Sequence, residues 1–288
     1  MRNFFRDILL TLLLGVLIVL ALPKPPEYNN NIGYKHHYIT HHAADIKTLI
    51  MGHSHFENGL NPHLLGDSAF NLASAGRPFY YDIEILRQYL PKMSNVKTVL
   101  FPLRYRLSDS DFFKERFLQG LFEDYYYGWN IMPPKEYAIH FKKPARWIPH
   151  YRRYTQERLN VDSLGYVVDR TSPAHMTEIE TMSLASQSEA DLVVNYLGSM
   201  AEECAKHNVR LIVLAAPQSD LFLSYTTKAG TSQMDSVVAC VKKNHPIEYH
   251  NYMADSALRT DTLYRDWTHL NSYGADIFTK RIKEDLGL

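Results

Sequence analysis

Two short segments far apart in the chain carry the side chains of a nucleophilic site. The first, at 52–55, reads Gly-His-Ser-His and supplies Ser54. The second, at 266–269, reads Asp-Trp-Thr-His and supplies Asp266 and His269. A serine hydroxyl becomes a good nucleophile only when an imidazole takes its proton, and a carboxylate must fix the tautomer of that imidazole. The three residue types therefore indicate a Ser-His-Asp site, provided that the fold brings them together.

Strands and helices alternate along the chain after residue 45, and this alternation must position the two segments. We expect strands at 46–51, 69–73, 96–103, 209–216 and 247–252, and helices at 81–90, 189–207, 234–243 and 275–286. Such alternation is typical of a parallel sheet that is covered by helices on both faces. The predicted fold is a three-layer α/β/α sandwich with a mostly parallel sheet, formed by residues 46–288.

In this fold Ser54 is expected at the ligand-binding edge of the sheet. Ligands of open parallel sheets bind beyond the carboxyl ends of the strands, and Ser54 follows the first strand directly. Gly52 permits a tight turn there, and a following helix would add backbone N–H donors for an oxyanion. Asp266 and His269 are three residues apart, so one turn can direct both side chains into the same cavity.

Composition narrows the class of protein. The 288 residues have a mass of 33.4 kDa and are 45% hydrophobic, which is enough for one main domain. The net charge is +0, with 31 basic and 31 acidic residues, so no nucleic-acid partner is expected. No cofactor is expected either. The two cysteines, Cys204 and Cys240, exclude a thiolate zinc cluster. They could form one bridge, but two free buried thiols are favoured.

The N-terminal segment, residues 1–22, has the pattern of a signal anchor. Arg2 and Arg6 precede a run without charges at 8–22. Length alone leaves a cleaved signal peptide open, but the poor cleavage site at 19–21, with Pro23 close behind, favours an uncleaved transmembrane helix. The positive-inside rule then puts the rest of the chain outside the cytoplasm, which in a bacterium means an inner-membrane protein with a periplasmic domain. Residues 23–45 resemble a juxtamembrane linker.

Histidines suggest two metal alternatives, and neither is favoured. The first is a cluster in the expected linker, formed by His36, His37, His41 and His42. No carboxylate or cysteine accompanies it, so a solvated linker is the preferred interpretation. The second uses His53 and His55 with Asp266 and His269, but His53 would have to reach past Ser54. No metal is therefore expected.

The chain resembles the SGNH or GDSL-type hydrolase family. The first block of that family, a strand followed by Gly-Asp-Ser, is similar to residues 50–54, and its last block, Asp-x-x-His, is matched by Asp266 and His269. Its second block corresponds to residues 71–76. The chain is most similar to membrane-anchored members that handle acyl groups of cell-envelope polymers, such as the alginate O-acetylation proteins and the teichoic-acid D-alanylation protein.

The resemblance implies roles for these residues. Ser54 would be the nucleophile, His269 the general base and Asp266 its orienting carboxylate. The backbone N–H groups of Ser54 and Gly76, with the Asn71 amide, would hold the oxyanion. The implied protein is an anchored serine esterase or O-acyltransferase acting on an acylated cell-envelope polysaccharide. A bilayer contacted through residues 4–22 and a membrane-bound acyltransferase would be its partners. The alternative is a non-catalytic envelope protein that binds a glycan or a membrane partner.

Two departures from the family pattern bear on activity. His53 stands where the family has Asp, and the third block, Gly-x-Asn-Asp, is absent, because residues 99–106 read VLFPLRYR. Loss of an oxyanion donor typically costs about a hundred- to a thousand-fold in rate. Arg104 or Tyr105 could replace the donor, and a charged Arg104 would suit an anionic substrate. Arg104 could equally be a surface residue that ends the strand.

A region rich in aromatic residues, at about 106–188, interrupts the predicted sheet. It holds tyrosine and tryptophan among several prolines, for example at 125–129 and 147–154. Such an insertion could form a cap whose rings stack on sugars. Packing of the rings against the domain is the favoured alternative, because many apolar residues accompany them.

Overall fold

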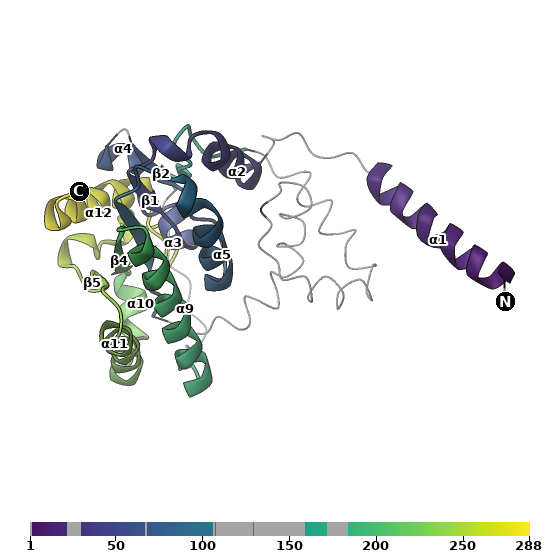
Figure 1. Ribbon diagram of the computed structural model, residues 1–288. Coiled ribbons are helices and arrows are strands. Elements are labelled where there is room, and N and C mark those ends of the chain that lie inside the picture. The colour runs from purple at the N-terminus through teal and green to yellow at the C-terminus, as the bar shows by residue number, and fades with distance from the viewer. Residues whose placement is uncertain are drawn as a thin grey trace.

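A parallel sheet of five strands lies at the centre of the domain (Figure 1). The computed structural model describes residues 2–21, 30–66, 68–105, 107, 129, 159–171 and 184–288. The strand order is β2-β1-β3-β4-β5 and every pairing is parallel. The strands are β1 (Thr48–Ile50), β2 (Ala69–Asn71), β3 (Thr98–Pro102), β4 (Arg210–Ala215) and β5 (Glu248–Asn251). All five predicted strands are thereby confirmed.

Both faces of the sheet are buried, which explains why its central strands are continuous apolar runs. Successive side chains of a strand point to opposite faces. In β4, Leu211 and Val213 therefore belong to one apolar cluster, whereas Ile212 and Leu214 belong to a second cluster across the sheet. All four are at most 2% exposed.

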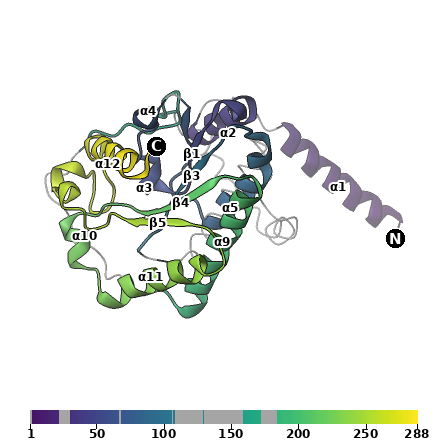
Figure 2. The ribbon, with the colours of Figure 1, turned by 60° about the vertical axis from the view of Figure 1, so that its left-hand side comes forward.

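Helices form the two outer layers, as Figure 2 shows. The first cluster includes buried side chains of α2 (Asn31–His41), α5 (Phe79–Tyr89), α9 (Gln187–Lys206) and α11 (Lys228–Lys242). The second includes side chains of α3 (Ser54–Glu57), α4 (Pro62–Leu65) and α12 (Ser272–Leu286). Shorter elements are η1 (Ala43–Asp45), η2 (Leu90–Lys92), α10 (Asp220–Ser224), η5 (Ser256–Leu258) and η6 (Asp261–Leu263). The predicted three-layer α/β/α arrangement is confirmed.

The expected linker at 23–45 is wrong for its second part, because residues 30–45 belong to the domain. Ile32 and Ile39 of α2 are 5% and 0% exposed, and the ring of Tyr38 stacks on Phe70 with centroids 3.9 Å apart. Only a narrow stripe of α2 is apolar, so its sequence lacks the broad hydrophobic period of a core helix. The imidazole of His36 in this helix bonds to the Tyr89 hydroxyl at 2.8 Å. Residues 22–29 lie outside the described residues.

The N-terminal segment forms helix α1 (Arg2–Ala21). The leucines at 9–17 are exposed, with Leu9 at 68% and Leu13 at 53%. Within the described part of the chain, no helix combines the length and the apolar character needed to cross a membrane.

Little of the aromatic insertion belongs to the described residues. Trp129 is fully buried, as expected if such rings pack on the core. The other aromatic residues singled out in the sequence lie outside the described residues. The segment 159–171 is described and lies against the domain, where Asn71 donates its backbone N–H to the Leu164 carbonyl at 2.8 Å. Both cysteines are free, with Cys204 buried and Cys240 exposed.

Candidate active site

Ser54 lies at the start of the short helix α3, immediately beyond the carboxyl end of β1. The connecting residue Gly52 has a φ of +101°, and a Cβ there would collide with the Pro102 ring on the neighbouring strand β3. Only glycine meets both conditions without strain. In the strand order 2-1-3-4-5, β1 and β3 flank the point where the order reverses, which is where ligands bind in doubly wound sheets. The predicted position of Ser54 is confirmed.

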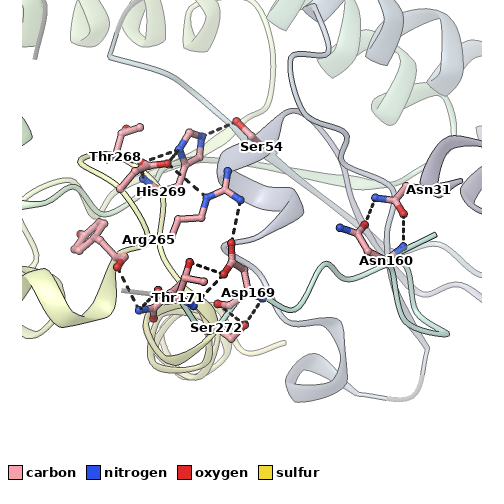
Figure 3. A network of polar contacts seen from close by, with 12 residues as sticks. Asn31, Ser54, Asn160, Asp169, Thr171, Arg265, Thr268, His269 and Ser272 are labelled. Carbon is pink, nitrogen blue, oxygen red and sulfur yellow. Dashed lines mark hydrogen bonds and ion pairs between the residues drawn. The ribbon is translucent and has the colours of Figure 1, made fainter. Parts of the chain in front are cut away.

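Ser54, His269 and Asp266 form a continuous hydrogen-bonded chain. Figure 3 shows the Ser54 hydroxyl directed at the His269 ring. The Ser54 hydroxyl lies 2.7 Å from Nε2 of His269. On the other side of the ring, Nδ1 lies 2.9 Å from each carboxylate oxygen of Asp266. These contacts join residues 215 positions apart in the sequence. The arrangement allows His269 to accept the hydroxyl proton while Asp266 orients the ring.

The loop that carries Asp266 and His269 is held closed at its base. Tyr264 and Leu270 form an antiparallel bridge, and the backbone N–H of Arg265 donates to the His269 carbonyl at 3.0 Å. Oδ1 of Asp266 also accepts the N–H groups of Thr268 and His269 at 3.0 and 2.8 Å. Burial by itself would raise the pKa of Asp266, but the bonds and charge from His269 and these N–H groups outweigh it and hold the pKa well below its ordinary range. Asp266 is therefore ionised at neutral pH.

The two expected oxyanion donors, the backbone N–H groups of Ser54 and Gly76, belong to the exit loops of β1 and β2. The exit loops of β1 and β2 are joined by a hydrogen bond from the Ser74 N–H to the Gly52 carbonyl at 2.9 Å. Gly76 follows in this second loop with a φ of +69°. Among the residues that the structure describes, neither the Ser54 nor the Gly76 N–H donates a hydrogen bond.

The Asn71 side chain supports the segment that begins at Ser54. Its amide nitrogen donates to the carbonyls of Phe56 at 2.8 Å and Leu60 at 2.9 Å, and its oxygen accepts the Ala73 N–H at 3.1 Å. The side chain is fully buried. The expected oxyanion-binding residue thus has its amide hydrogens directed to α3 and the turn after it.

The histidines beside the nucleophile, His53 and His55, are both neutral. Burial is the main cause that lowers the pKa of each ring well below its ordinary value. The second cause is a positive charge, that of Arg104 for His53 and that of His269 for His55. The ring of His55 packs 4.6 Å from that of His269, and its Nε2 lies 2.8 Å from the Thr268 hydroxyl. No group of three or more His, Cys, Asp or Glu side chains within the described ranges is arranged to hold a metal.

Arg104 lies beyond the end of β3, where the third block of the family would lie. Its guanidinium carbon is 5.4 Å from the centre of the Phe79 ring. Its charge contributes to the lowered pKa of both His53 and His55. Tyr105 points elsewhere, since its hydroxyl accepts the backbone N–H of Thr227 at 2.8 Å.

Sequence reasoning missed four charged residues around the site. Glu57 accepts the Ala75 N–H at 2.9 Å and pairs with the buried Lys35 at 3.4 Å, linking α3, the Gly76 loop and α2. Arg265 pairs with both Asp266 and Asp169. Glu57 lies one helical turn after the nucleophile and Arg265 is next to Asp266, so their spacing was a usable signal. Lys35 and Asp169 had none, because they lie in segments expected to be a linker and an insertion.

Comparisons with known proteins give distant likenesses only. No protein-family model matches the chain, and no curated protein matches it. A GDSL-like lipase from Bacteroides thetaiotaomicron has 13% identity and a TM-score of 0.45, over 90% of this chain and 98% of that one. A catalytic mutant of an acetylxylan esterase from Geobacillus stearothermophilus has 11% identity and a TM-score of 0.43, over 84% and 94%. Such distant likenesses define no family, and the chemistry of the chain follows from its own geometry.

Proposed function

We propose that this protein is a serine esterase or O-acyltransferase of the SGNH type. The observation that carries the proposal is the unbroken chain from the Ser54 hydroxyl through His269 to Asp266, with contacts of 2.7 and 2.9 Å. Each of the three side chains has the partner that its role requires. Their placement beyond the carboxyl ends of β1 and β5 agrees with a substrate that binds at this edge of the sheet.

The proposed reaction proceeds through an acyl-enzyme. His269 takes the Ser54 proton while the Ser54 oxygen attacks the ester carbonyl, and the Ser54 and Gly76 N–H groups stabilise the resulting oxyanion. Collapse breaks the ester bond, and the leaving alcohol takes the proton from His269. A water or a sugar hydroxyl then gives its proton to His269 and attacks the acyl carbon. The bond between the acyl carbon and the Ser54 oxygen breaks, and His269 returns the proton to that oxygen. Water gives hydrolysis, and a sugar gives acyl transfer.

The substrate class is proposed from the resemblance to envelope-modifying family members. An acylated cell-envelope polysaccharide would supply the ester, and a membrane-bound acyltransferase would be the partner if the chain works in transfer. The position of Arg104 beyond β3 supports a substrate that carries negative charge. The sugar and the acyl group are fixed by none of these residues.

We also propose that residues 4–22 attach the domain to a bilayer on its extracytoplasmic side. The charge-free run at 8–22, the exposed leucines of α1 and the preceding arginines Arg2 and Arg6 support this proposal. Flotation of the full chain with anionic phospholipid vesicles tests it. The double substitution Leu13→Asp and Leu17→Asp should abolish flotation, whereas equal flotation of both proteins would contradict attachment through this segment.

The catalytic proposal is tested on the full chain with a chromogenic acetyl ester and a fluorophosphonate probe. Ser54→Ala should reduce turnover by about 10⁴-fold or more, because removing the nucleophile of a triad leaves only the binding contributions. The probe should add to Ser54 in the wild type and to no other serine. Ser236→Ala, a change of the same kind on the surface of α11, should keep full activity.

Two results would decide against it. Equal ester turnover in wild type and Ser54→Ala would exclude the serine mechanism. Lack of both turnover and probe labelling in the wild type, together with retained binding of an acylated glycan, would favour the non-catalytic alternative. With a glycan acceptor present, the mass of the glycan distinguishes transfer from hydrolysis.

A further inference from the structure

The segment 159–171 is hydrogen-bonded to the residues that directly follow the loop carrying Asp266 and His269. The Asp169 carbonyl accepts the backbone N–H of Ser272 at 2.6 Å, and the Ser272 hydroxyl bonds to the Asp169 backbone as well. The carbonyl of Thr171 accepts the Asn271 amide at 3.1 Å. These contacts join positions about a hundred residues apart and hold Asp169 next to the residues that follow the loop.

The side chain of Asp169 extends this contact toward the triad (Figure 3). Its Oδ2 lies 3.4 Å from Nη1 of Arg265, and Nε of the same guanidinium lies 3.5 Å from Oδ2 of Asp266. Arg265 therefore lies between two carboxylates. The Arg265 and Asp169 side chains are only 27% and 24% exposed, so solvent screens the three charges incompletely.

This arrangement affects the balance between His269 and Asp266. A guanidinium bound to Asp266 alone would neutralise much of the charge that His269 needs when its ring becomes positive. A second carboxylate on the far side of the guanidinium offsets that effect. Hydrogen bonds from Thr171 and the charge of Arg265 overcome the burial of Asp169 and lower its pKa, so this second carboxylate is charged at neutral pH.

We propose that Asp169 is a positioning residue for the triad, which acts through Arg265 to keep the Asp266 charge available to the His269 ring. The inference rests on the proposed function, because it assigns His269 the role of general base. It extends that function to a residue of the insertion, four side chains away from the nucleophile.

Other charged and titratable groups also face the His269 ring, and the test must keep them unchanged. Asp266 contacts its Nδ1, and the ring of His55 packs against it. The ring of His53 packs in turn on His55, and the charge of Arg104 acts on both of these rings. His53 and His55 remain neutral because burial lowers the pKa of each. The substitution Asp169→Asn leaves all of them in place and retains an oxygen for the Thr171 bonds, while it removes the negative charge that Arg265 contacts.

The test compares the wild type with Asp169→Asn, Arg265→Gln and the double variant. NMR of the histidine rings follows the titration of His269, and the acetyl-ester assay gives the pH profile of kcat/KM. Asp169→Asn should move both the His269 titration and the acid limb of the profile to lower pH by about 0.3 to 0.5 unit, and lower kcat by about two- to fivefold. Arg265→Gln should move both to higher pH, and adding Asp169→Asn to it should produce a smaller further change.

Opposite shifts in the two single variants cannot arise from loss of folding. Glu84→Gln removes a carboxylate of similar exposure from the Glu84–Arg87 pair on α5 and should leave the profile unchanged. An unmoved His269 titration in Asp169→Asn, or a shift that is undiminished in the Arg265→Gln background, would overturn the proposal. The NMR titration requires no turnover. An inactive wild type would therefore refute the proposed function, and the NMR titration would still test the effect of Asp169 on His269.

Discussion

The loops that carry Ser54 and Gly76 are held in place by buried polar side chains. Asn71 satisfies two carbonyls of the segment that begins at Ser54 and one N–H of the β2 exit loop. Glu57 holds that exit loop through Ala75. The loops that carry Ser54 and Gly76 are thus fixed to one another by these two side chains, and such support is required for a preorganised site.

The role of Asn71 leads to a prediction at the residue scale. Asn71→Ala would leave the Leu60 carbonyl and the Ala73 N–H without partners and would remove one of the two donors to the Phe56 carbonyl. We expect it to lower the free energy of unfolding by about 3 kcal/mol. Urea unfolding followed by circular dichroism measures this loss. Asn95→Ala removes an exposed amide that bonds a single carbonyl, that of Ala44, and should cost much less. Unchanged stability of Asn71→Ala with a large loss of kcat would instead identify Asn71 as an oxyanion donor.

At the scale of elements, helix α2 connects the N-terminal part of the domain to the site. Its Lys35 is completely buried, pairs with Glu57 and donates to the Ala73 carbonyl. Burial lowers the pKa of Lys35 from its ordinary value of 10.5 to about 8, against the opposing effect of Glu57. The helix is therefore part of the support for the Gly76 loop.

The buried Lys35 predicts an unusual dependence of stability on pH. Between about pH 8 and 10.5 the unfolded chain retains a proton on Lys35 that the folded chain has lost, so a rise in pH favours folding. Compared with Lys35→Met, the wild type should gain up to about 1.4 kcal/mol of unfolding free energy per pH unit in this window. Urea unfolding of both proteins at about pH 8 and pH 10 measures the gain. Lys47→Met, at an exposed position, should show no such trend, and a constant difference for Lys35→Met would refute the prediction.

At the scale of the whole molecule, the core consists of two apolar clusters on opposite faces of one sheet. Cys204 of α9 is 1% exposed in the larger cluster, and burial raises the pKa of its thiol to about 12. Cys240 of α11 is exposed. The two thiols therefore report separately on the surface and on the core.

This contrast predicts the pattern of thiol labelling. In the native protein Cys240 should react rapidly with a thiol reagent, whereas Cys204 should react only as fast as the core opens. Its labelling rate should rise with urea in parallel with global unfolding, as measured by mass spectrometry in a Cys240→Ser variant. Rapid labelling of Cys204 without urea would show that the layer containing α9 opens independently of the sheet.

Much of the fold and the position of the triad follow from local sequence patterns. Alternating apolar strands and helices determine the parallel sheet, since each strand is buried on both faces. Asp266 and His269 share one turn, and Ser54 follows the first strand, so their meeting at the carboxyl edge is a consequence of topology. These features depend on spacing within a segment or on strand order, which a sequence displays.

The tertiary structure alone decided which residues support the triad. Lys35 meets Glu57 over a separation of 22 residues, and Asp169 meets Arg265 over 96. Such pairs depend on how a helix or an insertion packs, and neither the narrow apolar stripe of α2 nor the irregular segment 159–171 has a period that predicts its neighbours. The chemistry is thus encoded locally, whereas the charges that tune it are brought together by long-range packing.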